Sequence, residues 1–171
     1  MFKISVVIPT LHFWLNPNKQ QPINEMYFAT ILDGRLPDAD VNIIDLRELR
    51  KEGCQYTLEN VEDFVEERDL YVHWIDRTGN FSEIIHVTNK LRKKYPNSKH
   101  VAGGFHVANL QDECLKVFDA IVTGPGEEAF IKIAEDCVSN KLQEYISIIG
   151  KAFLSINIHI QDDTIYQKNS Y

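Results

Sequence analysis

The sequence predicts an α/β domain in which a parallel β-sheet is covered by helices on both faces. Short apolar runs alternate five times with helical patterns, which implies right-handed crossovers between parallel strands. The first run, residues 3–8 (KISVVI), is apolar on both faces, as in a strand buried between two helical layers. With 171 residues, 44% of them hydrophobic and 25% charged, the chain fits one globular domain with a full core.

A long loop follows the first strand. Residues 11–22 (LHFWLNPNKQQP) combine bulky side chains with a polar, proline-bearing tail. Loops of this length in compact domains are functional or disordered. Phe13 and Trp14 beside His12 indicate a loop that covers a ligand. Packing of these side chains against the sheet edge explains them equally well.

Helix caps define the elements in the middle of the chain. Asn24 and Thr57 can each cap a helix, and Pro96 ends another. β-branched and aromatic runs between these helices predict two strands. In chain order, the predicted helices and strands of this part are residues 24–32, 41–44, 57–65, 70–75 and 81–95.

Two successive strand ends carry glycine. The strand of residues 99–102 runs into Gly103 and Gly104, and the strand of residues 118–122 runs into TGPGEE before a helix over residues 127–138. Glycine occurs where the backbone takes a positive φ or where a bulky group approaches the main chain. Turn geometry alone can explain one such pair, whereas two successive glycine-bearing ends favour a ligand that lies across the sheet edge.

The five strands are expected in the order 2-1-3-4-5, the flavodoxin-like or Rossmann-like arrangement, with ligands at the carboxyl ends of the strands. The C-terminal part departs from this pattern, because residues 153–160 (FLSINIHI) and 164–167 flank a turn and predict a β-hairpin. We therefore divide the chain into an α/β domain, residues 1–140, and a C-terminal extension of a helix and β-hairpin, residues 141–171.

Composition argues against several kinds of partner. The net charge of −7 and the isoelectric point near 5.3 argue against a nucleic-acid surface, which needs clustered Lys and Arg. No apolar run could span a bilayer and no signal peptide is evident, so we expect a cytoplasmic protein without a membrane partner. Cys54, Cys114 and Cys137 have neither disulfide, zinc nor iron–sulfur spacing.

Common catalytic and nucleotide-binding motifs are missing. No glycine fingerprint follows the first strand and no GxxxxGK[ST] is present. His12, His73, His100 and His106 lie at or near strand ends, where imidazole could ligate a metal, but no HxxxH, HxH or HExxH pair supports this. No spaced catalytic set is found, so a small hydrolase or nucleotide-binding enzyme is the weakest alternative.

Residues 101–130, VAGGFHVANLQDECLKVFDAIVTGPGEEAF, resemble part of a known family. The glycine pair with its aromatic residue and histidine, and the later strand that leads into GxGE, are similar in order to the cobalamin-binding domain that precedes the catalytic barrel in many radical S-adenosylmethionine enzymes. The upstream part is similar too, with a first strand ending in proline and a VxIIDL second strand. The resemblance covers residues 3–138.

The resemblance implies that the chain binds cobalamin. It places Gly103 and Gly104 against the nucleotide loop of the cofactor. The dimethylbenzimidazole tail then lies next to the second turn, at Gly124, Gly126 and Glu127. The other candidate cofactor-binding residues are Thr10, His12, His73 and Trp74.

The resemblance also implies a base-off cobalt without a histidine ligand. Of the Asp-x-His-x-x-Gly motif found in histidine-ligated cobalamin proteins, the chain keeps only His12, which is the less favoured cobalt ligand. His73 stands near the position where many of these domains have Ser or Thr after the third strand, so that hydroxyl contact must be replaced or absent.

The chain contains no CxxxCxxC motif, so it cannot assemble the iron–sulfur cluster that binds S-adenosylmethionine. We therefore expect a cobalamin-binding module that is not an enzyme alone. It would serve a radical S-adenosylmethionine methyltransferase or rearrangement enzyme whose catalytic domain is not in this chain. The expected partners are a corrinoid and that catalytic domain or chain. The alternative is a degenerate interaction domain of the same fold that no longer binds cobalamin.

Overall fold

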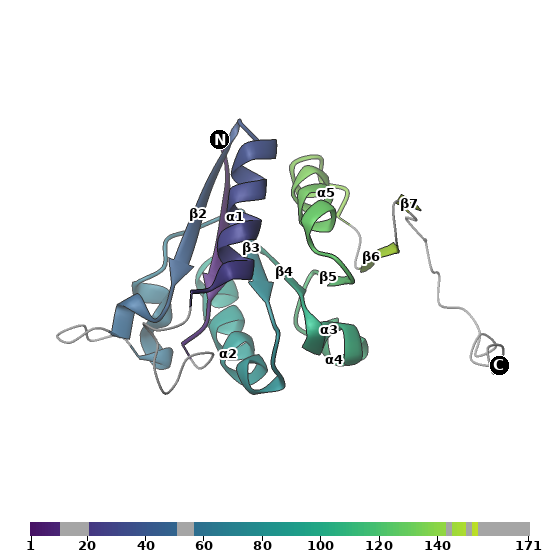
Figure 1. Ribbon diagram of the computed structural model, residues 1–171. Helices are drawn as coiled ribbons and strands as arrows, with labels where there is room; N and C mark the ends of the chain where they lie inside the picture. The colour runs from purple at the N-terminus through teal and green to yellow at the C-terminus, as the bar shows by residue number, and fades with distance from the viewer. Residues whose placement is uncertain (11–20, 51–56, 143–144, 150–151, 154–171) are drawn as a thin grey trace, which may run out of the picture.

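The computed structural model describes residues 1–10, 21–50, 57–142, 145–149 and 152–153 (Figure 1). They form a sheet of order β2-β1-β3-β4-β5-β6-β7, in which β1 to β6 are parallel. The predicted order 2-1-3-4-5 of the first five strands is confirmed. The strands are β1 Phe2–Ile8, β2 Ala39–Asp45, β3 Leu70–Trp74, β4 Lys99–Gly103, β5 Ala120–Thr123, β6 Tyr145–Ile149 and β7 Ala152–Phe153.

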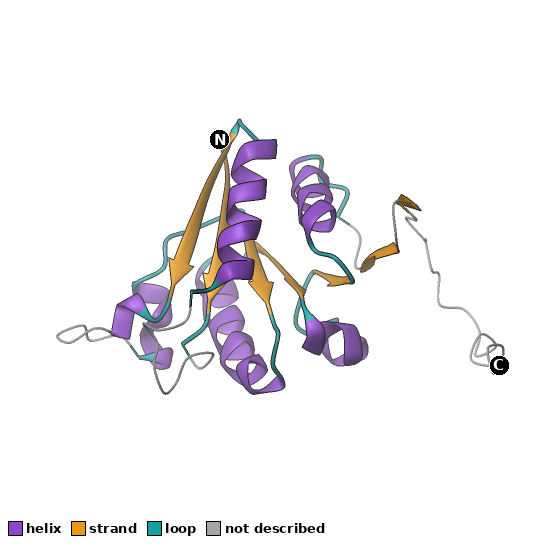
Figure 2. Cartoon of the chain, in the orientation of Figure 1, coloured by secondary structure: helices purple, strands orange, loops and turns teal. Residues whose placement is uncertain are grey.

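Helices cover both faces of the sheet, as Figure 2 shows. α1 and α5 pack on one face, and α2, α3, α4 and the 3-10 helix η3 pack on the other. We call these the α1/α5 face and the α2 face. The helical elements are α1 Ile23–Arg35, η2 Glu48–Arg50, η3 Leu58–Asp63, α2 Thr78–Lys94, α3 Phe105–Asn109, α4 Gln111–Cys114 and α5 Glu127–Val138.

The strand β1 lies inside the sheet, between β2 and β3. Ile4 and Val6 are fully buried in the core of the α1/α5 face, and Val7 is buried in the core of the α2 face. A strand covered on both sides needs apolar residues on both sides. The sequence pattern of residues 3–8 therefore predicts this position in the fold.

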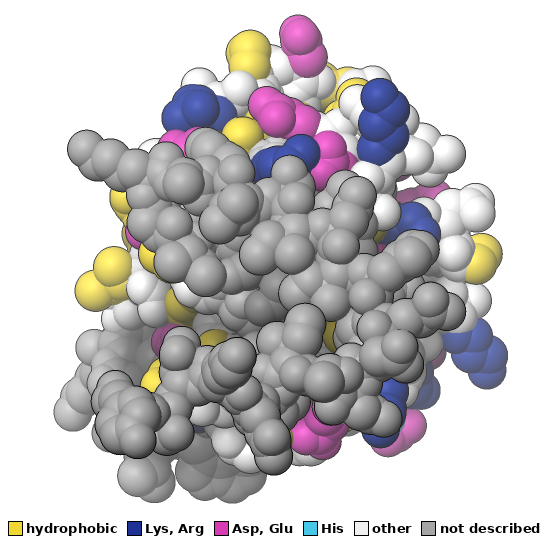
Figure 3. All heavy atoms as spheres, turned by 90° about the vertical axis from the view of Figure 1, so that its right-hand side faces the viewer, with side chains coloured by type: hydrophobic (Ala, Val, Ile, Leu, Met, Phe, Trp, Pro, Cys, Tyr) yellow, Lys and Arg dark blue, Asp and Glu magenta, His cyan; other side chains and the backbone are white. Residues whose placement is uncertain are grey.

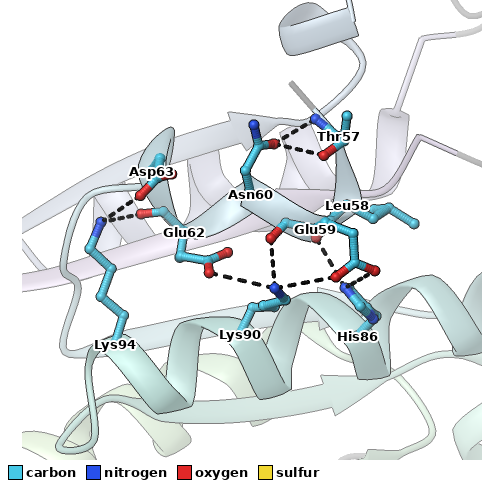
Figure 4. A network of polar contacts seen from close by, with 9 residues as sticks. All are labelled: Thr57, Leu58, Glu59, Asn60, Glu62, Asp63, His86, Lys90 and Lys94. Carbon is cyan, nitrogen blue, oxygen red and sulfur yellow. Dashed lines mark hydrogen bonds and ion pairs between the residues drawn. The ribbon is translucent and has the colours of Figure 1, made fainter. Parts of the chain in front are cut away.

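A polar network joins η3 to α2 (Figure 4). Lys90 Nζ lies 3.4 Å from a carboxylate oxygen of Glu59 and 3.6 Å from one of Glu62. His86 Nε2 lies 3.0 Å from the Leu58 carbonyl oxygen. Exposed ion pairs contribute little to stability, so the apolar contact beneath the network is the main attachment of η3. Its buried side chains are Val61, Val65, Val87 and Leu91.

Element boundaries differ from the sequence prediction by a few residues. α1 begins at Ile23, before the predicted cap Asn24, because the Asn24 side chain instead donates a hydrogen bond to Asp76 across 3.2 Å. α2 begins at Thr78, ahead of residue 81. The short helix predicted over residues 57–65 is a 3-10 helix with a kink at Asn60.

The C-terminal extension differs more. Where a helix is expected, Tyr145–Ile149 form β6, which extends the sheet in parallel beside β5, and Ala152–Phe153 form β7, which returns antiparallel and pairs Ala152 with Ile149. The run YISII of β6 is β-rich, but a helical continuation of α5 competes with it in the sequence. The predicted hairpin arms, residues 153–160 and 164–167, lie outside the described residues except for Phe153.

Candidate functional site

The carboxyl ends of β1, β3, β4 and β5 meet at one edge of the sheet, because these strands are parallel. In Figure 2 their arrowheads point toward the same end of the molecule. α2, α3 and α5 start from this carboxyl edge, and the bond from Asn24 to Asp76 ties the start of α1 to it. The two glycine-bearing turns therefore become neighbours, as the sequence predicts.

Gly104 is required by a close approach between the turn after β4 and the end of β3. Ile75 donates its N–H to the Gly103 carbonyl oxygen across 2.8 Å, and His106 donates its N–H to the Ile75 carbonyl oxygen across 3.0 Å. Gly104 has φ +108°, and a Cβ added there would lie 2.7 Å from the Ile75 carbonyl oxygen. The fold itself thus requires glycine at this position.

Gly103 and Gly126 face an aromatic cluster formed by Phe28, Trp74 and Phe130. A Cβ added at Gly103 would lie 3.0 Å from both Trp74 and Phe130. One added at Gly126 would lie 2.9 Å from Phe28 and from Phe130. The ring centroid of Phe28 lies 4.7 Å from that of Trp74 and 5.0 Å from that of Phe130. The glycines make room for these rings on the α1/α5 face.

The second turn is more open. Gly124 is exposed and has φ +113°, a conformation that favours glycine. Gly126 is the N-cap of α5, and its carbonyl oxygen accepts the Phe130 N–H across 2.9 Å. Glu127 is half-buried in the first turn of α5, where a carboxylate favours the helix dipole.

Thr10 lies at the carboxyl edge, but its polar atoms are used within the chain. Its N–H and its hydroxyl both donate to Glu83 Oε1, across 2.8 Å and 2.5 Å. Glu83 belongs to α2, so this contact ties the end of β1 to that helix. His12, the other candidate from the first loop, lies outside the described residues.

His73 does not join Trp74 at the α1/α5 face. Adjacent residues of a strand point to opposite faces, and His73 is buried on the α2 face against Phe118. Its Nε2 lies 3.4 Å from His100 Nδ1. Burial lowers the pKa of His73 well below its usual value and that of His100 to about 3, with Arg92 adding to both shifts. The pair is therefore neutral.

The described histidines do not form a metal site. His106 is buried over the ring of Phe81, with Nδ1 3.2 Å from the Thr78 hydroxyl. Within the described residues, no three His, Cys, Asp or Glu side chains are placed to hold a metal ion. Burial raises the pKa of Cys114 to about 11 and that of Cys137 to about 12, so both thiols are protonated at neutral pH.

Glu25 is an acidic residue at the carboxyl edge that the sequence analysis missed. It lies in the first turn of α1, is 2% exposed, and its Oε1 has no hydrogen-bond partner. Burial, with the nearby Asp76 charge, raises its pKa to about 7. The signal in the sequence is its position on the apolar stripe of α1, three residues before Phe28 and seven before Leu32.

Exposed apolar side chains stand beside this edge. Phe105, directly after Gly104, is 73% exposed at the start of α3. Ile23 is equally exposed at the start of α1. Together they give the rim of the carboxyl edge an apolar character that fits a large, partly apolar ligand.

Figure 3 shows the side of the molecule that carries β6 and β7. Where Figure 3 shows described residues, basic and acidic side chains lie intermixed. Nucleic-acid binding requires clustered positive charge. In the ranges that the structure describes, no helix has the length and apolar character needed to cross a membrane.

The arrangement fits a flat ligand that lies across the carboxyl edge, against the backbone of the two turns and the ring of Phe105. It fits an inserted group poorly. Among the described residues, the space that Gly103 and Gly126 face is filled by the aromatic cluster.

Comparison with known proteins supports the fold. No protein-family model matches the sequence, and no curated protein matches it. Among solved structures, the chain is similar to the radical S-adenosylmethionine methyltransferase TsrM from Kitasatospora setae, determined with its tryptophan substrate and a S-adenosylmethionine analogue, with a TM-score of 0.57 and 16% identity. The match covers 82% of this chain and 26% of that enzyme. At this identity the likeness shows the fold alone.

Replacing Gly104 by Ala should destabilise the protein by more than about 2 kcal/mol, because the new Cβ meets the Ile75 backbone at a positive φ. Urea unfolding measures the loss. Gly79→Ala is the matched control, since a Cβ there meets nothing within 4 Å and α2 favours alanine. Equal stabilities of the two variants would contradict this account of the turn.

Acid should weaken the fold through the histidine pair. The folded-state pKa of each ring lies below the unfolded value of 6.5, so the unfolded state binds more protons, and stability present above pH 6.5 is lost as the pH falls toward 3. Replacing His100 by Gln should make this decline shallower in unfolding titrations. His86→Gln, a half-buried histidine of α2, is the control, and an unchanged slope in the His100 variant would refute the role of the pair.

Replacing Glu25 by Gln should stabilise the protein above pH 7. The folded-state pKa is raised from 4.5 to about 7, so the stability that this group contributes below pH 4.5 is lost as the pH rises through 7. Glutamine has no charge to bury, and we expect a gain of about 1–3 kcal/mol at alkaline pH and little gain in acid. Glu128→Gln, on the exposed side of α5, should show no such dependence in parallel unfolding measurements.

Proposed function

We propose that this chain is a corrinoid-binding module that serves a radical S-adenosylmethionine methyltransferase or rearrangement enzyme. The catalytic part of that enzyme would be a separate domain or a separate chain. The observation that carries the proposal is the pair of neighbouring glycine-bearing turns at the carboxyl edge, after β4 and β5. The sequence resemblance of residues 101–130 supports it, as does a fold like that of part of a radical S-adenosylmethionine methyltransferase.

Several groups would hold the corrin. Exposed backbone at Gly124 leaves room for a flat ring, and Phe105 offers an apolar surface beside it. Among the described residues, Oε1 of Glu25 and the indole N–H of Trp74 are buried without a hydrogen-bond partner, and these two groups have the acceptor and donor character that amides on the rim of a corrin require. A bound corrinoid would supply the cobalt chemistry of methyl transfer or radical rearrangement.

The cobalt would receive no histidine from the described part of the chain. His73 is paired with His100 inside the α2 face, and His106 is held against Phe81. His12 stays the less favoured candidate ligand. The role of the module is therefore to bind and orient the corrin and to exclude water from its lower face.

A second candidate is an interaction domain of the same fold that no longer binds a corrinoid. The aromatic cluster favours it, because the space facing Gly103 and Gly126 is filled from within the chain. The N–H and the hydroxyl of Thr10 both donate hydrogen bonds to Glu83, so they are already used within the chain, which also favours the interaction domain. Direct binding measurements separate the two candidates.

Titration of the full chain with hydroxocobalamin and, separately, with diaquocobinamide should shift the corrin absorption bands for at least one of them. Phe105→Ala should weaken this binding about fivefold, as loss of an aromatic contact of about 1 kcal/mol implies. Val138→Ala, an equally apolar exposed residue at the far end of α5, should bind as the unmodified protein does. Unchanged spectra with both corrinoids would reject the proposed function and support the interaction domain.

A further inference from the structure

The resemblance implies that a nucleotide base lies beside the two glycine-bearing turns, and the aromatic cluster fills the space that Gly103 and Gly126 face there. Gly103 and Gly126 come from different turns, yet both face the same space on the α1/α5 face. Phe130 lies against both glycines, Trp74 also meets Gly103 and Phe28 also meets Gly126, and the three rings contact one another. A methyl group at either glycine would already be in tight contact, at 2.9–3.0 Å.

Trp74 is the least buried ring of this cluster and stands at the carboxyl end of a strand. Phe28 and Phe130 are 4% and 1% exposed and belong to the core between α1 and α5. Trp74 is half-buried and is the last residue of β3, in register with Gly103. Its indole is a flat bicyclic ring of about the size of dimethylbenzimidazole, so the chain fills the place of a lower base with a base-like ring of its own.

The indole N–H of Trp74 is a second, independent observation, because it lacks a hydrogen-bond acceptor in the part of the chain that the structure describes. Nε1 of Trp74 is buried, and no described residue is placed to accept its hydrogen bond. An unpaired buried donor costs about 1–3 kcal/mol. Corrin rings carry acetamide and propionamide side chains, whose carbonyl oxygens are acceptors for such a donor.

We propose that the corrinoid bound by this chain is one without an inserted lower base, of the cobinamide type, and that Trp74 sets this preference by standing where the base would go. This inference rests on the proposed function and specifies its ligand. A corrinoid with a bare lower face can lie flat against the glycine turns. Cobalamin must either keep its base beneath the ring, which holds the ring away from the edge, or displace Trp74.

The test compares affinities of the full chain for diaquocobinamide and hydroxocobalamin, measured by absorption titration. The unmodified protein should bind cobinamide at least about tenfold more tightly. Trp74→Ala should open the space and shift the ratio of the two affinities toward cobalamin by about tenfold, with the bound cobalamin showing a base-off spectrum. Trp74→Phe keeps an aromatic ring and should preserve most of the preference for cobinamide. Circular dichroism reports whether each variant is folded.

The outcomes separate the inference from the proposed function. If the unmodified protein binds cobalamin base-off as tightly as cobinamide, the inference is wrong while the proposed function stands. The same holds if the affinity ratio is unchanged in a folded Trp74→Ala variant. If neither corrinoid binds to the unmodified protein, the proposed function fails and the inference fails with it. The ratio in the unmodified protein decides the matter even where a variant does not fold.

Discussion

Contact between glycine backbone and aromatic rings at the carboxyl edge determines what this molecule can accommodate. Gly103 and Gly126 let Phe28, Trp74 and Phe130 come within van der Waals distance of two turns at once. The cluster joins α1, α5, β3 and both turns into one packed unit. Because protein interiors tolerate few voids, this unit defines the floor of any site on the edge.

The two faces of the sheet have different chemistry. The core of the α1/α5 face is formed by apolar side chains, with Glu25 buried at its edge, whereas the α2 face buries the histidine pair and the Tyr71 ring that stacks on His100 at 4.8 Å. Within the part of the chain that the structure describes, the outer ring nitrogens, Nδ1 of His73 and Nε2 of His100, are buried without a hydrogen-bond partner. Such groups specify packing at some cost in stability, and they do not face the carboxyl edge.

Much of the fold could be predicted from sequence, because hydrophobic periodicity and glycine turns are local signals that the sheet preserves. The opposite orientations of the His73 and Trp74 side chains also follow from strand alternation, so the sequence alone is enough to place the two on different faces of the sheet. What fills the space beside Gly103 could not be predicted, since Phe130 and Phe28, the neighbour of Trp74, lie on helices remote from it in sequence. The burial of Glu25 depends in the same way on the ends of β2 and β3.

Pairing of β6 with β5 also changes which strand forms the edge of the sheet. Without β6, the open backbone groups of the apolar strand β5 would form an edge able to recruit another chain. With it, the described sheet ends in β7, a strand of two residues, on one side. On the other side β2 carries polar residues, including Asp40, which pairs with Arg68 at 2.5 Å. Short or charged edges resist fibril-like association, and the described sheet has one edge of each kind.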